Sequence, residues 1–175
     1  DYNGGEYEGA HYTQMSQTNA KRCSTEVGYL RKVRHRSNLT VVTSALVDKL
    51  LIKNNQVTGL RYLSLNSAGS PEASQDIAVS GEVILSAGAI SSPMILERSG
   101  IGEASILEGK GIAVTCDLPG VGQNLQDHLN VRTTYECTKP ITVNDLFTKR
   151  TFAMRSGIEY FILRRGLMTT PTITC

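Results

Sequence analysis

Hydrophobic and polar residues alternate most clearly in the middle of the chain, between residues 39 and 79. Apolar residues recur there at the spacing of a half-buried strand. The predicted strands are Leu39–Thr43, Leu46–Ile52 and Val57–Leu65. Asn54 and Asn55 favour a turn between the last two. Residues 66–76, rich in Ser, Ala and Gly, predict a surface loop, and Ile77–Val79 predicts a short strand. The pattern therefore predicts a β-meander.

A continuous apolar run, Val83–Leu85, follows the meander. It is too short for a globular helix and is typical of a strand buried on both faces. Three small residues come next, Ser86, Ala87 and Gly88. Their side chains leave the backbone N–H groups accessible to a bulky ligand. The segment predicts a strand that ends in an open turn.

A helix is predicted directly after this turn, with Ser91 or Ser92 as its N-cap and Pro93 in its first turn. Ser99-Gly100 is a typical end signal. A strand, a small-residue turn and a helix N-terminus together favour anionic ligands, because free N–H groups and the helix dipole point at one place. An ordinary tight turn between a strand and a helix remains the alternative.

Weaker patterns complete the predicted order of elements. They predict strands at 10–17, 112–114 and 129–136 and helices at 24–34, 103–110 and 144–163. Ser24 caps the first of these helices, and Glu26 suits its first turn. The basic cluster at 31–36 suits the last turn of the same helix. No aromatic residues are interleaved with that cluster, so we do not expect nucleic-acid binding.

Overall composition sets broad limits. The chain has 175 residues, a net charge of +2 and no apolar run near the ~20 residues that cross a bilayer, so no transmembrane segment is predicted. Its four cysteines have no metal-site spacing. Scattered thiols of this kind are typical of a reduced, intracellular setting rather than a secreted one, and no metal site is predicted.

Several motifs of the chain occur in the same order as in one known protein family. They are DYNGG at 1–5, SNLTVVTSALV at 37–47, GAISSPMILERSGIG at 88–102, DLPGVGQNLQDHL at 117–129 and, more weakly, RRGLMTTP at 164–171. The third resembles the second signature of the glucose-methanol-choline oxidoreductases, which are FAD-dependent alcohol oxidases and dehydrogenases. The likeness extends over nearly the whole chain and is greatest to the choline-dehydrogenase-like branch.

The resemblance implies an α/β fold. It implies part of a Rossmann-like FAD-binding domain, three-layered and with a β-meander, together with part of an α+β substrate domain. The substrate domain would comprise residues 1–22 and 116–175, and the FAD-binding domain residues 23–115. Tyr12, Gln14 and Ser16 would share one face of a substrate-domain strand.

The same resemblance suggests cofactor contacts. It implies that the backbone of Val47 binds the FAD adenine, while Ser86, Ala87 and Gly88 let the chain approach the cofactor and Ser92 marks the helix N-terminus. No catalytic residue is assigned, because none of the three histidines matches the family's catalytic pair. Asp127-His128 is tempting for acid–base chemistry, but neighbouring residues of a strand point apart.

Two family features are absent from the sequence: the GxGxxG turn that holds the ADP part of FAD, and the catalytic His segment. We therefore expect an internal fragment of a longer enzyme, inactive alone, that oxidises choline or a similar primary alcohol by hydride transfer to flavin N5. Its partners would be the alcohol and an electron acceptor such as oxygen or a quinone. A truncated, non-catalytic remnant that acts through protein contacts is the alternative. The missing GxGxxG disfavours an NAD-dependent Rossmann dehydrogenase.

Overall fold

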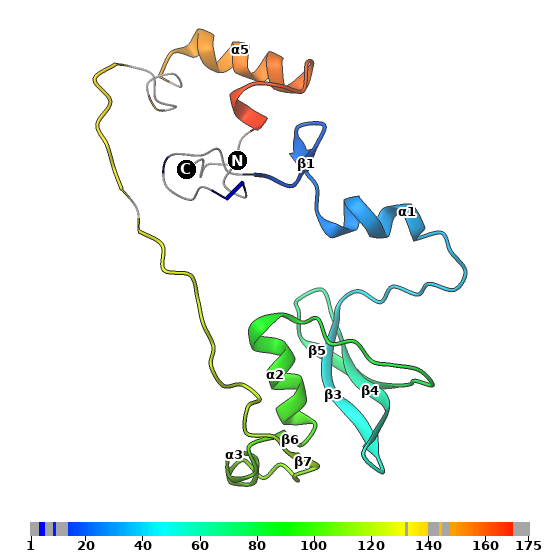
Figure 1. Ribbon diagram of the computed structural model, residues 1–175. Coiled ribbons are helices and arrows are strands. Elements are labelled where there is room, and N and C mark those ends of the chain that lie inside the picture. Colours follow the sequence, from blue (N-terminus) through cyan, green and yellow to red (C-terminus); the bar gives the residue numbers. More distant parts are fainter. Residues whose placement is uncertain are drawn as a thin grey trace. The chain divides into compact units, whose positions relative to one another are not determined.

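A computed structural model of the chain describes residues 4, 5, 9, 14–131, 133–139, 144 and 148–169 (Figure 1). The chain forms two compact units, one of residues Val41–Asn130 and the other of Asp1–Thr40 with Val131–Cys175. These bounds differ from those of the predicted domain segments. The bounds of the two units do not show which unit binds the cofactor and which the substrate, so the domain assignment stays a prediction.

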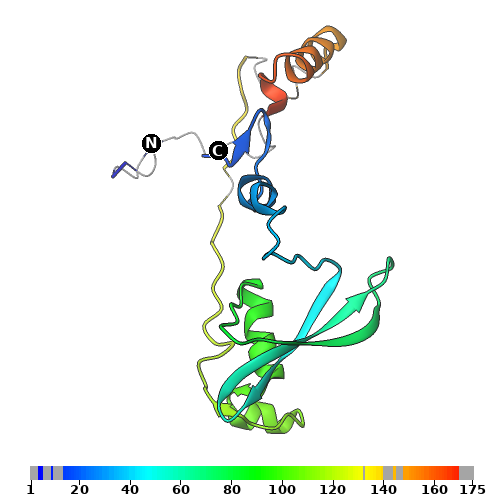
Figure 2. The same ribbon diagram turned by 90° about the vertical axis from the view of Figure 1, so that its right-hand side faces the viewer.

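The predicted β-meander is present in the unit of Val41–Asn130. Strands β3 (Ala45–Lys53), β4 (Gln56–Leu65) and β5 (Pro71–Ala78) form an antiparallel sheet in the order β3-β4-β5 (Figures 1 and 2). Asn54 and Asn55 make the tight turn between β3 and β4 with φ angles of +50° and +59°. Asparagine tolerates this left-handed conformation better than most residues, so the turn prediction is confirmed.

Two details of the predicted meander are wrong. Leu39–Thr43 forms no strand, and Val41 and Val42 are 38% and 51% exposed, since no strand in the described residues pairs with them. The predicted loop 66–76 is shorter, because β5 already begins at Pro71. The Asn66 side chain closes the turn by accepting the N–H groups of Ala68 and Ser70 at 3.0 and 2.9 Å. Pairing with β4 thus outweighs the loop-like composition of β5.

Helix α2 (Gly88–Arg98) packs against β3, and their contact forms the core of this unit (Figure 1). Leu50 on β3 and Ile95 on α2 are each 6% exposed. Gly100 ends the helix with φ +84°, as its position after the last turn predicts.

The chain continues from α2 through β6 (Ile101–Gly102), α3 (Ala104–Gly109) and β7 (Cys116–Asp117), and β6 pairs with β7 in parallel. Leu107 of α3 is only 2% exposed. The predicted helix at 103–110 is therefore confirmed.

Three predicted strands, at 83–85, 112–114 and 129–136, are not strands in the described part of the chain. The reason is the same in each case: a strand exists only beside a partner that completes its hydrogen-bond ladder. Ile84, predicted to be buried on a two-sided strand, is instead 82% exposed.

The other unit holds short elements. A hairpin joins β1 (Gln17–Thr18) to β2 (Lys21–Arg22), α5 covers Arg150–Phe161, and the 3-10 turn η2 covers Leu167–Thr169. The helix predicted at 144–163 is confirmed for α5. Of the strand predicted at 10–17, residues 10–13, including Tyr12, lie outside the described residues; Gln14 and Ser16 belong to no strand, and only Gln17 falls in β1.

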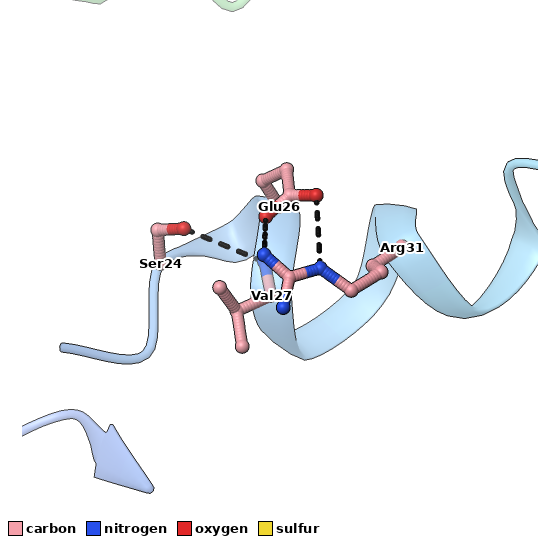
Figure 3. Close-up of polar contacts among 4 residues, drawn as sticks. All are labelled: Ser24, Glu26, Val27 and Arg31. Carbon is pink, nitrogen blue, oxygen red and sulfur yellow. Dashed lines mark hydrogen bonds and ion pairs between the residues drawn. The ribbon is translucent and has the colours of Figure 1, made fainter. Parts of the chain in front are cut away.

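The helix predicted at 24–34 begins with a π-helical turn, η1 (Glu26–Leu30), and continues as α1 (Arg31–Val33). The N-cap of η1 is Thr25 rather than the predicted Ser24, although the Ser24 hydroxyl accepts the Val27 N–H at 3.4 Å (Figure 3). The Arg31 guanidinium binds both Glu26 carboxylate oxygens at 3.2 and 2.8 Å (Figure 3). The spacing of five residues matches the π-turn, whose backbone bond also joins Arg31 N–H to Glu26 O. This contact raises the pKa of Arg31.

Three further observations concern the described residues. None of their helices is long and apolar enough to span a bilayer. Cys23, Cys116 and Cys137 carry free thiols. No cluster of His, Cys, Asp and Glu among these residues has the arrangement of a metal site.

Candidate functional site: an open turn at a helix N-terminus

The turn before α2 is open to solvent. Ser86, Ala87 and Gly88 are all exposed, and Gly88 has a φ of +90°. A Cβ at Gly88 would have no atom within 4 Å, so the space beside its backbone is free. The positive φ explains why glycine is placed here, and the free space allows a ligand to lie against the main chain.

Helix α2 begins earlier than predicted. Its first residue is Gly88, so neither Ser91 nor Ser92 is its N-cap, and Pro93 lies in the second turn rather than the first. The Ser92 Oγ instead accepts the Ala87 N–H at 3.0 Å. The left-handed conformation of Gly88 allows the helix to start directly after the turn, and Ser92, within the helix, stabilises the turn through its bond to Ala87. The Ser92 hydroxyl keeps its proton available for a second partner.

The start of α2 has the electrostatic character of an anion site. The N–H groups of the first helical turn, which includes Gly88 and Ala89, have no acceptor within the helix. The partial positive charge of the helix dipole lies at the same end. Backbone groups and dipole therefore favour a negatively charged ligand group in the open space beside Gly88.

A groove of about 410 Å³ lies along one face of α2, from Ala89 to Glu97. One wall is a face of the helix and the other is the segment 122–126. The polar side chains of the groove belong to Glu97, Gln123, Asn124 and Gln126. The two walls come closest at Gly122, where a Cβ would lie 2.9 Å from Glu97 Oε1. The sequence motif GVGQNL contains most of these residues, but its pattern gave no role to their side chains.

Val47 lies at an irregularity of β3. Val47 pairs with Tyr62 and Lys49 with Arg61, so Asp48 is an extra residue that forms a β-bulge. After the bulge, Leu50 pairs with Leu60. Tyr62 and Leu60 share a face of β4, so the bulge places Val47 on the same face as the buried Leu50. Simple alternation along β3 would have placed them on opposite faces.

The structure thus places all five predicted cofactor residues in the unit of Val41–Asn130. Ser86, Ala87, Gly88 and Ser92 form one turn, with Ser92 bonded to Ala87. Val47 belongs to β3, the strand against which α2 packs. Their roles in cofactor binding remain a prediction.

The histidine candidates show no catalytic arrangement in the described residues. The Asp127 carboxylate accepts the backbone N–H of His128 at 2.7 Å, a local contact of the kind that shapes turns. His35 is exposed after the end of α1. His11 lies outside the described residues.

Comparison with known proteins identifies the family of the chain. Residues 1–130 match the family described as GMC oxidoreductase. The chain therefore belongs to the GMC oxidoreductase family, which confirms the resemblance inferred from its motifs.

Curated relatives include oxygen-dependent choline dehydrogenases. One from Pseudomonas fluorescens is 44% identical over 146 residues, which cover 82% of this chain and 25% of the relative. Another from Photobacterium profundum is 46% identical over 144 residues, which cover 82% of this chain and 24% of the relative. The chain spans about a quarter of the length of these relatives.

Solved structures agree on the fold. An FAD-dependent oxidoreductase from Chaetomium thermophilum is 31% identical with a TM-score of 0.76, covering 86% of this chain and 26% of that protein. A fungal aryl-alcohol oxidase is 30% identical with a TM-score of 0.76, covering 91% of this chain and 27% of that protein. The predicted α/β fold class is confirmed.

Proposed function

We propose that this chain forms part of the FAD site of an oxidoreductase that acts on the CH–OH group of choline or a similar primary alcohol. The carrying observation is the exposed, left-handed Gly88 at the start of α2, where an added Cβ would meet no atom within 4 Å. Support for the reaction class comes from relatives named oxygen-dependent choline dehydrogenases and a structural neighbour named an aryl-alcohol oxidase. A neighbour named an FAD-dependent oxidoreductase supports the cofactor.

The residues of this chain would hold the cofactor through its charge and its flat ring. The free N–H groups at the start of α2 suit a negatively charged group of the cofactor, because they donate hydrogen bonds where the helix dipole is positive. Gly88 leaves room for that approach. The Ser92 hydroxyl, which accepts the Ala87 N–H, donates its own proton to the ligand or to water. The backbone of Val47 serves the adenine.

Bound FAD would supply the redox chemistry by accepting a hydride from the alcohol carbon at flavin N5, and an acceptor such as oxygen or a quinone would remove the electrons. The residues of this chain bind and orient, and none is assigned the role of the base that takes the hydroxyl proton. That base and the ADP-binding turn are expected elsewhere in a protein of the relatives' length, so we expect this chain alone to be inactive.

A glycine pair tests the cofactor role of the turn. Gly88 and Gly111 both have positive φ angles, +90° and +70°, and a Cβ at either meets no atom within 4 Å. Gly88→Ala and Gly111→Ala therefore carry similar backbone strain in the folded chain. The test uses a protein of the relatives' length that contains this chain. We expect Gly88→Ala to weaken FAD binding about tenfold or more, because the added methyl group removes roughly one hydrogen bond between the backbone and the cofactor. Gly111→Ala should bind FAD like the wild type.

Flavin absorbance of the purified protein, followed by a panel of primary alcohols, tests the reaction class. Bound flavin that is bleached by choline or a related alcohol supports the proposal. A protein that carries no flavin and binds none on titration contradicts it and favours the non-catalytic remnant.

A further inference from the structure

Two contacts join the C-terminal end of α2 to β3. The Leu50 N–H donates to Ser99 Oγ at 2.8 Å, and the Arg98 guanidinium pairs with the Asp48 carboxylate. β3 is an edge strand, so Leu50 N–H, pointing away from β4, needs an acceptor that is not a strand. Ser99 supplies it. We call Asp48, Leu50, Arg98 and Ser99 the clamp.

The β-bulge makes Asp48 available to the clamp. As the extra residue of β3, Asp48 is freed from the ladder that holds its neighbours. Bulges redirect a side chain in this way and are frequent beside functional sites. The Asp48 side chain is 19% exposed, so the ion pair with Arg98 is partly shielded from water. The pair therefore fixes a position more firmly than a fully solvated pair would.

The helix end that carries the clamp is itself immobilised. Ser99 Oγ donates a hydrogen bond to Ile95 O, and Ile95 is 6% exposed. Gly100, with φ +84°, packs so closely that a Cβ would lie 2.4 Å from Ala113 O. Gly100 O also accepts the Thr115 N–H at 2.8 Å. The end of α2 cannot slide along β3 without breaking several of these contacts.

We propose that the clamp positions the cofactor site, because it fixes Val47 relative to the turn of Ser86–Gly88. This inference rests on the proposed function. Val47 directly precedes Asp48, and the turn is joined to Arg98 by the eleven residues of α2, a rigid rod about 16 Å long. The clamp therefore fixes the distance between Val47 and the turn of Ser86–Gly88, the two parts of the proposed FAD site. When the clamp is broken, this distance can vary, and a ligand that contacts both parts then binds more weakly.

The test measures the FAD dissociation constant of a protein of the relatives' length that contains this chain. We expect Asp48→Asn and Ser99→Ala each to weaken FAD binding about tenfold, because each removes one contact of the clamp. The double variant Asp48→Arg with Arg98→Asp should recover most of the affinity. Ser99→Thr, which keeps the hydroxyl, should bind FAD nearly as the wild type does.

Two matched controls separate positioning from general stability. Asp76 pairs with Arg61 on the same sheet, and the Ser105 hydroxyl of α3 donates to the carboxylate of Glu103, the residue before α3. Neither contact belongs to the clamp. Asp76→Asn and Ser105→Ala remove comparable contacts and should leave FAD affinity unchanged. Hydrogen exchange at the Leu50 amide gives a readout without cofactor, and we expect it to be faster in Ser99→Ala and unchanged in Ser105→Ala.

The outcomes are distinct. Wild-type protein that binds no FAD overturns the proposed function. Wild-type protein that binds FAD, with clamp variants that match their controls in affinity, overturns the positioning role alone. Loss of affinity in Asp48→Asn that the charge-swapped pair fails to recover would also count against the clamp.

Discussion

Gly122 lies against Glu97 across the groove beside α2, so closely that a Cβ at position 122 would stand 2.9 Å from Glu97 Oε1. Gly122 also has a φ of +76°. Two independent features, contact and backbone angle, therefore require glycine at this point of the PGVG segment.

Replacement of Gly122 by alanine should destabilise the fold by about 1–3 kcal/mol, the range for a non-glycine residue held at an unfavourable backbone angle. Chemical denaturation measures this loss. Gly120→Ala is the matched control, since a Cβ there meets no atom within 4 Å and its φ is not positive. Adding Glu97→Ala to Gly122→Ala should recover only part of the stability, because the side-chain contact is relieved and the backbone strain remains. Full recovery would show that the φ angle costs nothing.

Leu107 and Ile106 are neighbours on α3 with opposite environments, 2% and 45% exposed. Leu107→Ala should lower the free energy of unfolding by about 2–5 kcal/mol, because it leaves a cavity under the helix. Ile106→Ala should change it by no more than about 0.5 kcal/mol. Equal effects at both positions would mean that α3 packs differently from the arrangement described above.

The Arg61–Asp76 pair predicts a pH dependence. Arg61 binds both carboxylate oxygens of Asp76, at 2.7 and 2.9 Å, and this contact lowers the pKa of Asp76 below its ordinary value of 3.8. A lowered pKa in the folded state stabilises the fold at every pH above 3.8, and the contribution is lost as pH falls through the folded-state pKa. Asp76→Asn should therefore be less stable than the wild type at neutral pH, and the difference should vanish in acid.

Denaturation curves recorded across this pH range test the prediction. Glu72→Gln on the same strand is the control, because Glu72 forms no ion pair within the described part of the chain. A difference between Asp76→Asn and wild type that stays constant down to the lowest pH would contradict the assigned cause.

The Glu26–Arg31 contact should determine how firmly the π-turn is held. Arg31→Lys keeps the charge but loses the two-pronged bond to Glu26, so we expect faster hydrogen exchange at the backbone N–H of residue 31, which donates to Glu26 O. Lys32→Ala, next in the chain and exposed, should leave that exchange rate unchanged. If Arg31→Lys exchanges at the wild-type rate, the backbone alone maintains the turn.

The elements that can be predicted from the sequence are those whose stability is local or comes from pairing between neighbouring segments. Asn54 and Asn55 specify their turn by conformational preference, and Gly100 ends α2 for the same reason. β3 and β4 are adjacent in sequence, so each provides the other's ladder. The segment Val83–Leu85 has a strand-like composition but no pairing partner among the described residues, and composition cannot supply one.

The site was anticipated in outline and missed in detail. The small residues before α2 correctly predict an exposed turn. The predicted N-cap, Ser91 or Ser92, is wrong because the sequence pattern does not reveal the left-handed conformation of Gly88. The tie between Ser99 and Leu50 joins residues 49 positions apart, and no local pattern predicts such a contact. The close approach of Gly122 to Glu97 is likewise a contact between distant parts of the chain.

The single extra residue of β3 also bears on how this region tolerates change. Removal of Asp48 would give β3 and β4 a regular ladder and would leave Val47 opposite Tyr62, on the face that carries Leu50. The deletion would instead remove the carboxylate that pairs with Arg98. A shortened β3 would therefore keep its valine in place and lose its ionic tie to the helix.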